Sequence, residues 1–151
     1  MANVNNHEKQ ERYPGERFEL INRIPFAAQR VLLIGAGKGE LGYMLRKRAG
    51  VEVHGIEQDP TMRQVCKVTL DVTYPGRFGD TRILSRLPRQ FFDAAIVVDT
   101  GQFADAIEPG LQLLKPYLAR HAWVFLVLQD DQSAKPDFDR LLLRQGYLYY
   151  D

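Results

Sequence analysis

Short, apolar runs alternate with amphipathic segments along this chain. Residues 31–34 are uniformly aliphatic, as expected of a strand that is covered on both faces of a parallel sheet. The same reasoning predicts strands at residues 31–34, 51–56, 91–99, 123–128 and 147–150. Residues 69–73 fit either a strand or the end of a helix, and Tyr74-Pro75-Gly76 is typical of a turn.

Apolar residues at helical spacing occupy the intervals between these runs. Asp59 followed by Pro60 is a favourable helix start, because aspartate caps free N–H groups and proline fits the first helical position. The pattern predicts helices that begin near residues 15, 41, 60, 107 and 136. Residues 81–90 are basic and loop-like. Strands that alternate with helices predict an α/β fold whose doubly wound sheet is mostly parallel.

A glycine loop follows the first predicted strand. Gly35, Gly37 and Gly39 stand at alternate positions, and glycine lets the backbone turn sharply and approach a ligand. A dinucleotide fingerprint would require its third glycine where this chain has Glu40. An acidic side chain there would repel a pyrophosphate. The loop therefore favours a cofactor without phosphate and with a cationic centre, such as S-adenosylmethionine, over NAD.

Acidic residues end two of the predicted strands. Glu57 lies about 20 residues beyond the glycine loop, where open α/β folds bind the ribose of a nucleoside cofactor. We favour this role over a charge that only flanks a helix. Asp99 ends the strand at residues 91–99 and lies at the same edge of the sheet. His54 and Cys66 are expected to be structural.

Composition and charge narrow the range of functions. The chain has 151 residues, of which 45% are hydrophobic and 26% charged, with a formal net charge of +1. We expect a flexible N-terminus at residues 1–12 and one domain at residues 13–151. No net field favours nucleic acid, the single cysteine excludes a cysteine-rich metal site, and no metal site is expected. Without a long apolar run or a signal peptide, the expected location is the cytoplasm, not a membrane.

Taken together, these segments resemble the class I S-adenosylmethionine-dependent methyltransferases over roughly residues 13–130. The resemblance rests on five segments in family order, at residues 31–42, 55–57, 79–80, 92–99 and 113–116. Residues 13–25 are similar to the opening of small bacterial members that often accompany glycosyltransferases. The resemblance implies a Rossmann-like sheet of about six strands that stops short of the family's C-terminal hairpin.

The resemblance also implies a cofactor, an activity and a site. S-adenosylmethionine would donate a methyl group to a small-molecule or glycan-type acceptor. Glu57 would hold the ribose and Asp80 the adenine, while Asp99 would orient the acceptor or take its proton as the catalytic residue. Capping of the following turn is the alternative role of Asp99. The expected cofactor contacts are Gly35, Ala36, Gly37, Gly39, Glu57, Gln58, Asp80 and Asp99.

A second function stays open because the chain departs from the family pattern. Leu33 stands where the family usually has aspartate, and Thr100-Gly101 stands where many relatives carry Glu-His. The chain also stops about one strand early. The alternative is therefore a catalytically silent domain of this fold that binds the cofactor or a protein partner. The missing strand would leave an exposed sheet edge, from which we expect a homodimer.

Overall fold

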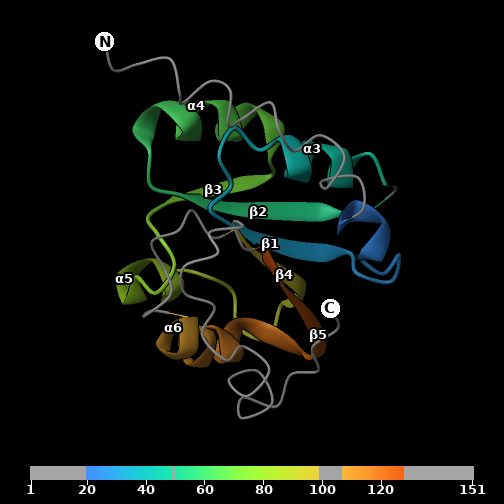
Figure 1. Cartoon of the computed structure of the whole chain (residues 1–151), viewed down its shortest axis with the longest axis vertical. Helices are drawn as coiled ribbons and strands as arrows, with labels where there is room; N and C mark the ends of the chain where they lie inside the picture. Colours follow the sequence, from blue (N-terminus) through green and yellow to red (C-terminus); the bar gives the residue numbers. More distant parts are fainter. Residues whose placement is uncertain (1–19, 49, 99–106, 128–151) are drawn as a thin grey trace, which may run out of the picture.

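Five parallel strands form one sheet in the part of the chain that the computed structural model describes, which is residues 20–48, 50–98 and 107–127. The strand order is β3-β2-β1-β4-β5, and every neighbouring pair is parallel (Figure 1). The strands are β1 (Arg30–Ile34), β2 (Glu52–Glu57), β3 (Val72–Pro75), β4 (Phe92–Val98) and β5 (Leu118–Val127). The order reverses between β1 and β4, which makes the carboxyl ends of these strands a topological switch point.

Helices cover both faces of this sheet. Figure 1 shows α3 and α4 on one side, with α5 and α6 on the other. Their bounds are α3 (Glu40–Arg46), α4 (Pro60–Thr69), α5 (Thr81–Leu84) and α6 (Ile107–Leu114), and a 3₁₀ turn, η1 (Lys115–Tyr117), leads into β5. Residues 20–23, before β1, are also helical. The predicted fold class is confirmed for the described residues.

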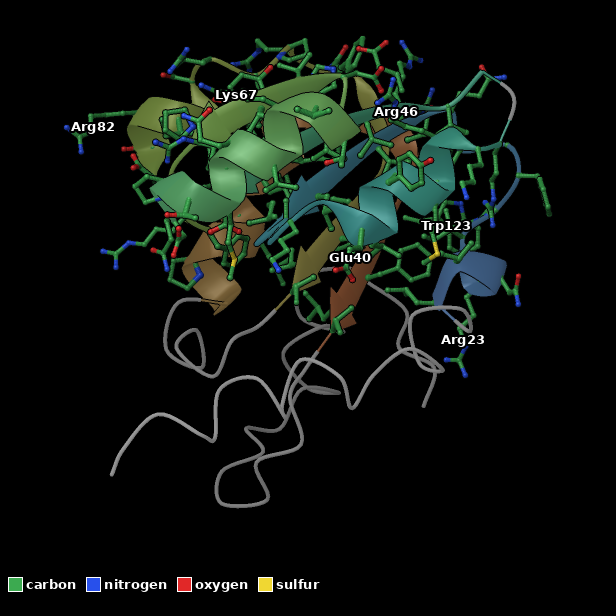
Figure 2. The ribbon with its side chains drawn as sticks, turned by 90° about the horizontal axis from the view of Figure 1, so that it is seen from above. Arg23, Glu40, Arg46, Lys67, Arg82 and Trp123 are labelled. Carbon is green, nitrogen blue, oxygen red and sulfur yellow. The ribbon has the colours of Figure 1, made fainter. Side chains whose placement is uncertain are left out.

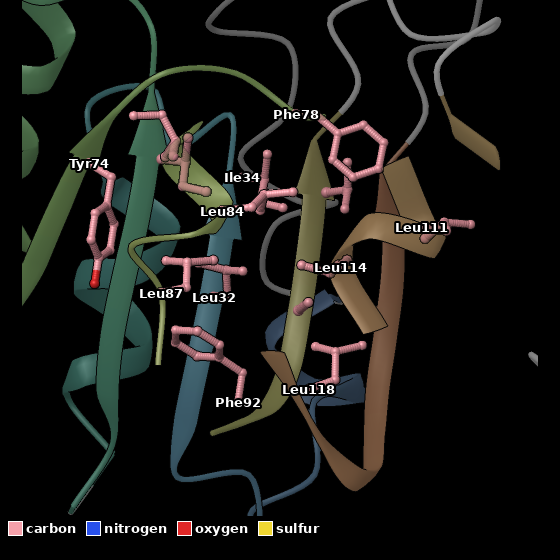
Figure 3. Close-up of a cluster of buried hydrophobic side chains, with 14 residues drawn as sticks. Leu32, Ile34, Tyr74, Phe78, Leu84, Leu87, Phe92, Leu111, Leu114 and Leu118 are labelled. Atoms are coloured by element: carbon pink, nitrogen blue, oxygen red, sulfur yellow. The ribbon is translucent and has the colours of Figure 1, made fainter. Parts of the chain in front are cut away.

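The uniformly apolar strands arise because the core lies on both faces of the sheet. Val31 and Leu33 of β1 pack with α3 and α4, whereas Leu32 and Ile34 pack on the opposite face. Figure 3 shows the cluster of buried side chains on the face of Leu32 and Ile34, in which Leu114 of α6 lies against the sheet. Alternate side chains of a strand point to opposite faces, so in a strand that is covered on both faces every side chain is buried and apolar residues are favoured at all positions.

The predicted start of the second helix is confirmed. Asp59 adopts an extended backbone, and its Oδ1 accepts hydrogen bonds from the N–H groups of Thr61 and Met62 at 2.8 and 3.1 Å. Pro60 is the first residue of α4, where a missing N–H group costs nothing. This local pair fixes where the chain leaves β2 and enters α4.

The prediction of a turn at Tyr74-Pro75-Gly76 is wrong. Tyr74 and Pro75 complete β3 and pair in parallel with Ile56 and Glu57 of β2. Among the described residues β3 is an edge strand, where proline is tolerated because the missing N–H group need not serve a second neighbour. Pairing with β2 thus overrides the local turn signal.

Two further boundaries differ from the sequence prediction. The basic segment at residues 81–90 begins with α5 rather than a loop, because Asp80 caps that helix by accepting the Arg82 N–H group at 3.1 Å. β5 begins at Leu118 rather than near Trp123, and its register against β4 shifts between Phe92 and Ala94. Residues 1–12, Asp99 and the helix and strand predicted after residue 136 lie outside the described residues.

Candidate functional site at the carboxyl edge of the sheet

The loop between β1 and α3 turns through three glycines with positive φ. Gly35, Gly37 and Gly39 have φ values of 75°, 58° and 78°, a region that side chains disfavour. Gly35 and Ala36 both donate their N–H groups to the carbonyl oxygen of Ile56, at 2.9 and 3.1 Å. These bonds hold the start of the loop against the end of β2.

Gly37 is held from one side and open on the other. Its N–H group donates to Glu57 Oε2 at 2.7 Å, and its carbonyl oxygen accepts from Cys66 Sγ at 2.8 Å. A Cβ atom built on Gly37 would meet no heavy atom within 4 Å. The loop therefore presents a bare backbone with a fixed orientation to the space above it.

Glu57 organises the loop as well as carrying charge. Its side chain is buried, and Oε1 accepts the Asp59 N–H group at 2.8 Å while Oε2 accepts that of Gly37. A carboxylate offers about four acceptor positions, so two are left for a ligand. The sequence prediction placed Glu57 at this edge but missed its hydrogen bonds to the loop, which only the fold brings into reach.

Cys66 belongs to the core, as predicted, and lies beneath the same loop. Burial, and to a lesser degree the nearby charge of Glu57, raise the pKa of its thiol to about 11. The thiol is therefore protonated at neutral pH and donates to the Gly37 carbonyl. Its role here is to orient a peptide group.

Gly39 has a packing role that the sequence did not indicate. A Cβ atom on Gly39 would lie 2.3 Å from Thr69 Oγ1, at the end of α4. A Cβ atom on Gly42, in α3, would lie 2.2 Å from Leu70 Cδ2. These glycines allow α3 to approach α4 and the residue that follows it.

A cleft of about 150 Å³ lies beside the loop, at the carboxyl ends of β1, β4 and β5. Its apolar lining comes from five side chains of separate segments, which are Leu20, Leu33, Leu41, Val98 and Val127. The loop residues 35–38 and the first residue of α3 complete the lining, so that Lys38 and Glu40 place charges of opposite sign on it. Figure 2 shows Glu40 at the beginning of α3.

The segment before β1 forms one wall of this cleft through Leu20. Arg48, which follows α3, donates from Nη1 to the carbonyl oxygen of Ile24 at 2.8 Å and from Nη2 to that of Ile21. Sequence analysis predicted a helix here but did not identify Leu20 as a lining residue or Arg48 as its support. Helical spacing reveals an apolar face and does not reveal which cleft the face borders.

Neither a metal site nor a membrane span is present among the described residues. No group of three or more histidine, cysteine, aspartate or glutamate side chains there could hold a metal ion. None of the helices in that part of the chain is long and apolar enough to cross a membrane.

No protein-family model matches this sequence, and no curated protein does. Solved structures do match. The TehB-like SAM-dependent methyltransferase from Corynebacterium glutamicum aligns with a TM-score of 0.68 at 20% identity, over 92% of this chain and 80% of its own. A SAM-dependent methyltransferase from Aquifex aeolicus gives a TM-score of 0.64 at 17% identity, over 87% of this chain and 79% of its own. The plantazolicin methyltransferase BpumL was solved with a pentazolic desmethylPZN analog and SAH. It aligns with a TM-score of 0.71 at 13% identity, over 93% of this chain and 67% of its own.

This chain has the fold of the class I methyltransferases. The resemblance predicted from the sequence is thereby confirmed at the level of the fold. The chain spans only 55% and 54% of the length of two other methyltransferase structures that it matches.

Within this methyltransferase fold, those predicted site residues that the structure describes form a row along the carboxyl edge of the sheet. Asp80 follows β3, Glu57 ends β2, the glycine loop follows β1, and the cleft extends over β4 and β5. Gly35, Ala36 and Gly37 line the cleft, whereas Gly39, Glu57, Gln58 and Asp80 do not. Asp80 Oδ1 is engaged by the Arg82 N–H group, and Gln58 is exposed.

Proposed function

We propose that this chain binds S-adenosylmethionine along the carboxyl edge of its sheet and transfers the methyl group to a small-molecule or glycan-type acceptor. The observation that carries the proposal is the row formed by Asp80, Glu57, the glycine loop and the cleft. An elongated ligand with a base, a ribose and an amino-acid end matches this row in the order of its polar groups. The methyltransferase fold supports the same reading.

The residues along the row fit this cofactor. Asp80 would accept from the adenine amino group, and the two remaining acceptor positions of Glu57 would accept from the ribose hydroxyls. The open side of Gly37 leaves room for the ligand to pass over the loop. Lys38 and Glu40 present the opposite charges that a zwitterionic amino-acid end requires.

The cofactor, when bound, supplies a methyl group that is electrophilic because it is attached to a positively charged sulfur. The protein's contribution would be positioning, since an acceptor atom must lie in line with that methyl group. The apolar side chains of Leu33, Leu41 and Val98 would exclude water from the cleft. Asp99, which immediately follows β4, is proposed to orient the acceptor or to take its proton.

A silent binding domain is the second candidate, and one observation favours it. Among the described residues that line the cleft, Glu40 is the one carboxylate and there is no histidine. A base for the acceptor would then have to come from Asp99 or from a partner. This candidate would be favoured if the wild-type protein binds S-adenosylmethionine but methylates no compound in a broad acceptor screen, whether or not cell extract is added.

Assembly and location are proposals on sequence grounds. We propose a homodimer, which light scattering would support with a particle of twice the chain mass and contradict with a particle of one chain mass. We propose the cytoplasm as the location. Fractionation of the producing cell would place the protein there, and recovery with the membranes would contradict the proposal.

The deciding experiment is calorimetric titration with S-adenosylmethionine, S-adenosylhomocysteine and NADH. We expect micromolar binding of the first two, no heat with NADH, and loss of binding in Glu57→Ala. A matched control is Glu52→Ala, on the same strand but at its opposite end. Binding of NADH alone, or of none of the three ligands by a folded protein, would contradict the proposed function.

A further inference from the structure

The wall of the cleft at Leu20 belongs to a short segment that is anchored at one end. Ile24 is buried in the core beside Leu33 and Leu41, with 1% of its surface exposed. Its N–H group lies 3.2 Å from the carbonyl oxygens of both Leu20 and Ile21, which closes a helical turn. Leu20 is therefore one turn away from the anchor, and its position depends on how that turn is oriented.

Arg48 fixes this orientation from outside the cleft. Its guanidinium group binds the carbonyl oxygens of Ile21 and Ile24, both near the end of the helical turn. The guanidinium carbon also lies 4.5 Å from the centre of the Phe26 ring, which is 82% exposed. Three contacts of one planar group thus join the chain just after α3 to the segment at residues 20–26.

An arginine is required for this geometry. The Ile24 carbonyl lies at the end of the helical turn, where carbonyl groups lack a partner within the helix, and the Ile21 carbonyl can accept from an external donor besides the Ile24 N–H group. The guanidinium group presents several N–H groups in a rigid plane that can also stack on an aromatic ring, whereas an ammonium is a point charge on a flexible stem. A lysine at position 48 would not hold both carbonyls and the ring together.

We propose that Arg48 is a positioning residue for ligand binding: it holds the Leu20 wall in place and thereby sets the affinity for the part of the ligand that enters the cleft. Arg48 does not line the cleft and acts through the carbonyl groups of Ile21 and Ile24. The inference rests on the proposed function for the identity of the ligand. The half of the ligand near Glu57 lies on the β2 side of the loop and is independent of this wall.

Arg46, the last residue of α3, provides a matched control two residues before Arg48. Arg46 Nη1 donates to the carbonyl oxygen of Thr69 at 2.7 Å, and Nη2 lies 3.2 Å from Asp71 Oδ1. It therefore ties α3 to the end of α4 with a similar set of contacts, to residues that do not themselves line the cleft. Removing either arginine loosens α3, but only Arg48 reaches the segment that carries Leu20.

The test compares Arg48→Ala, Arg48→Lys and Arg46→Ala by calorimetry with S-adenosylhomocysteine and with adenosine, well below each melting temperature. We expect Arg48→Ala to weaken the binding of S-adenosylhomocysteine by about tenfold, which is the scale of one lost charge-assisted hydrogen bond. The affinity for adenosine should not change. Arg48→Lys should fall between Arg48→Ala and wild type, and Arg46→Ala should bind both ligands normally. An equal loss for both ligands, or no loss in folded Arg48 variants, would overturn the proposal.

A second readout separates this inference from the proposed function. Amide exchange of Ile24 requires no ligand and should accelerate in Arg48→Ala and Arg48→Lys but not in Arg46→Ala. If wild type binds neither ligand while exchange follows this pattern, the proposed function fails and the anchoring of the segment stands. Unchanged exchange in the Arg48 variants would refute the anchoring itself.

Discussion

At the scale of single residues, Glu57 joins two turns that the chain must make at the same edge. One carboxylate oxygen accepts from Gly37 in the glycine loop, and the other accepts from Asp59 at the start of α4. The carboxylate is therefore a structural bridge, in addition to the ribose contact that we propose for it. This dual use explains why a charged side chain is buried at the end of β2.

Replacing Glu57 by glutamine should reduce stability even though size is conserved. The amide NH₂ group would face a backbone N–H donor, so one buried donor loses its acceptor. We expect Glu57→Gln to lower the free energy of unfolding by about 1–3 kcal/mol in urea titrations. Glu52→Gln, on the same strand but half exposed, is the control and should have a smaller effect. Equal stability of wild type and Glu57→Gln would contradict the bridging role.

Cys66 should make stability fall at high pH. Its thiol pKa is raised from 9.0 to about 11 in the folded chain, so the unfolded chain loses this proton first as pH rises. The stabilisation is complete below pH 9 and is lost as pH rises toward 11. Between pH 7.5 and 10.5 the wild type should lose about 2 kcal/mol more than Cys66→Ala, measured by urea unfolding at each pH.

The loss of stability is compared between wild type and Cys66→Ala because Tyr74 also titrates at high pH. Burial raises its pKa above 10.0, with a smaller opposing effect from Arg86, and both proteins share this contribution. A parallel loss of stability in wild type and Cys66→Ala would show that the thiol contributes nothing.

At the scale of elements, the packing of α3 against β2 depends on one leucine between glycines. Leu70, directly after α4, would clash with a Cβ atom on Gly42 at 2.2 Å and on Gly55 at 2.4 Å. Its two methyl groups therefore occupy the space that both glycines leave empty. Ordinary helix propensity would disfavour Gly42 inside α3, so packing decides this position.

Alanine at position 42 should therefore destabilise the fold, and removal of the leucine should relieve the clash. We expect Gly42→Ala to cost about 1–3 kcal/mol and Leu70→Ala about 2–5 kcal/mol. The double variant should cost less than the sum of both, because the alanine methyl group fills part of the cavity. Additive losses in chemical denaturation would contradict the direct contact.

At the scale of the whole molecule, the site depends on strands that are distant in the sequence. The cleft requires β1, β4 and β5 to be adjacent, with the segment at residues 20–24 beside them. A site built from so many parts forms only when the sheet is complete. Ligand binding should therefore stabilise the whole fold rather than one segment.

Thermal unfolding should follow one cooperative transition whose midpoint rises with the ligand. At about 100 times the dissociation constant, S-adenosylmethionine should add about 2.7 kcal/mol, or roughly 5–10 °C in Tm for a domain of this size. Calorimetry in the presence and absence of the ligand measures both. Glu57→Ala should show no rise, and two separate transitions would contradict the prediction of one domain at residues 13–151.

The sequence by itself determined the elements that local chemistry specifies. The apolar run at residues 31–34 required a strand covered on both faces, and Asp59-Pro60 fixed the start of α4. Gly35, Gly37 and Gly39 allowed the sharp turn with positive φ that the loop adopts, and Glu57 was placed correctly at the end of its strand. In each case the physical cause lies within a few neighbouring residues.

The tertiary structure alone decided which distant residues meet. It paired Tyr74 and Pro75 with β2 against their local turn preference, and it placed Cys66 beneath Gly37. It also brought Arg48 to the carbonyl groups beside Leu20, and so shaped the wall of the cleft. These contacts depend on strand order and on how closely helices approach the sheet, which are set by the packing of the whole core and leave no periodic trace in the sequence.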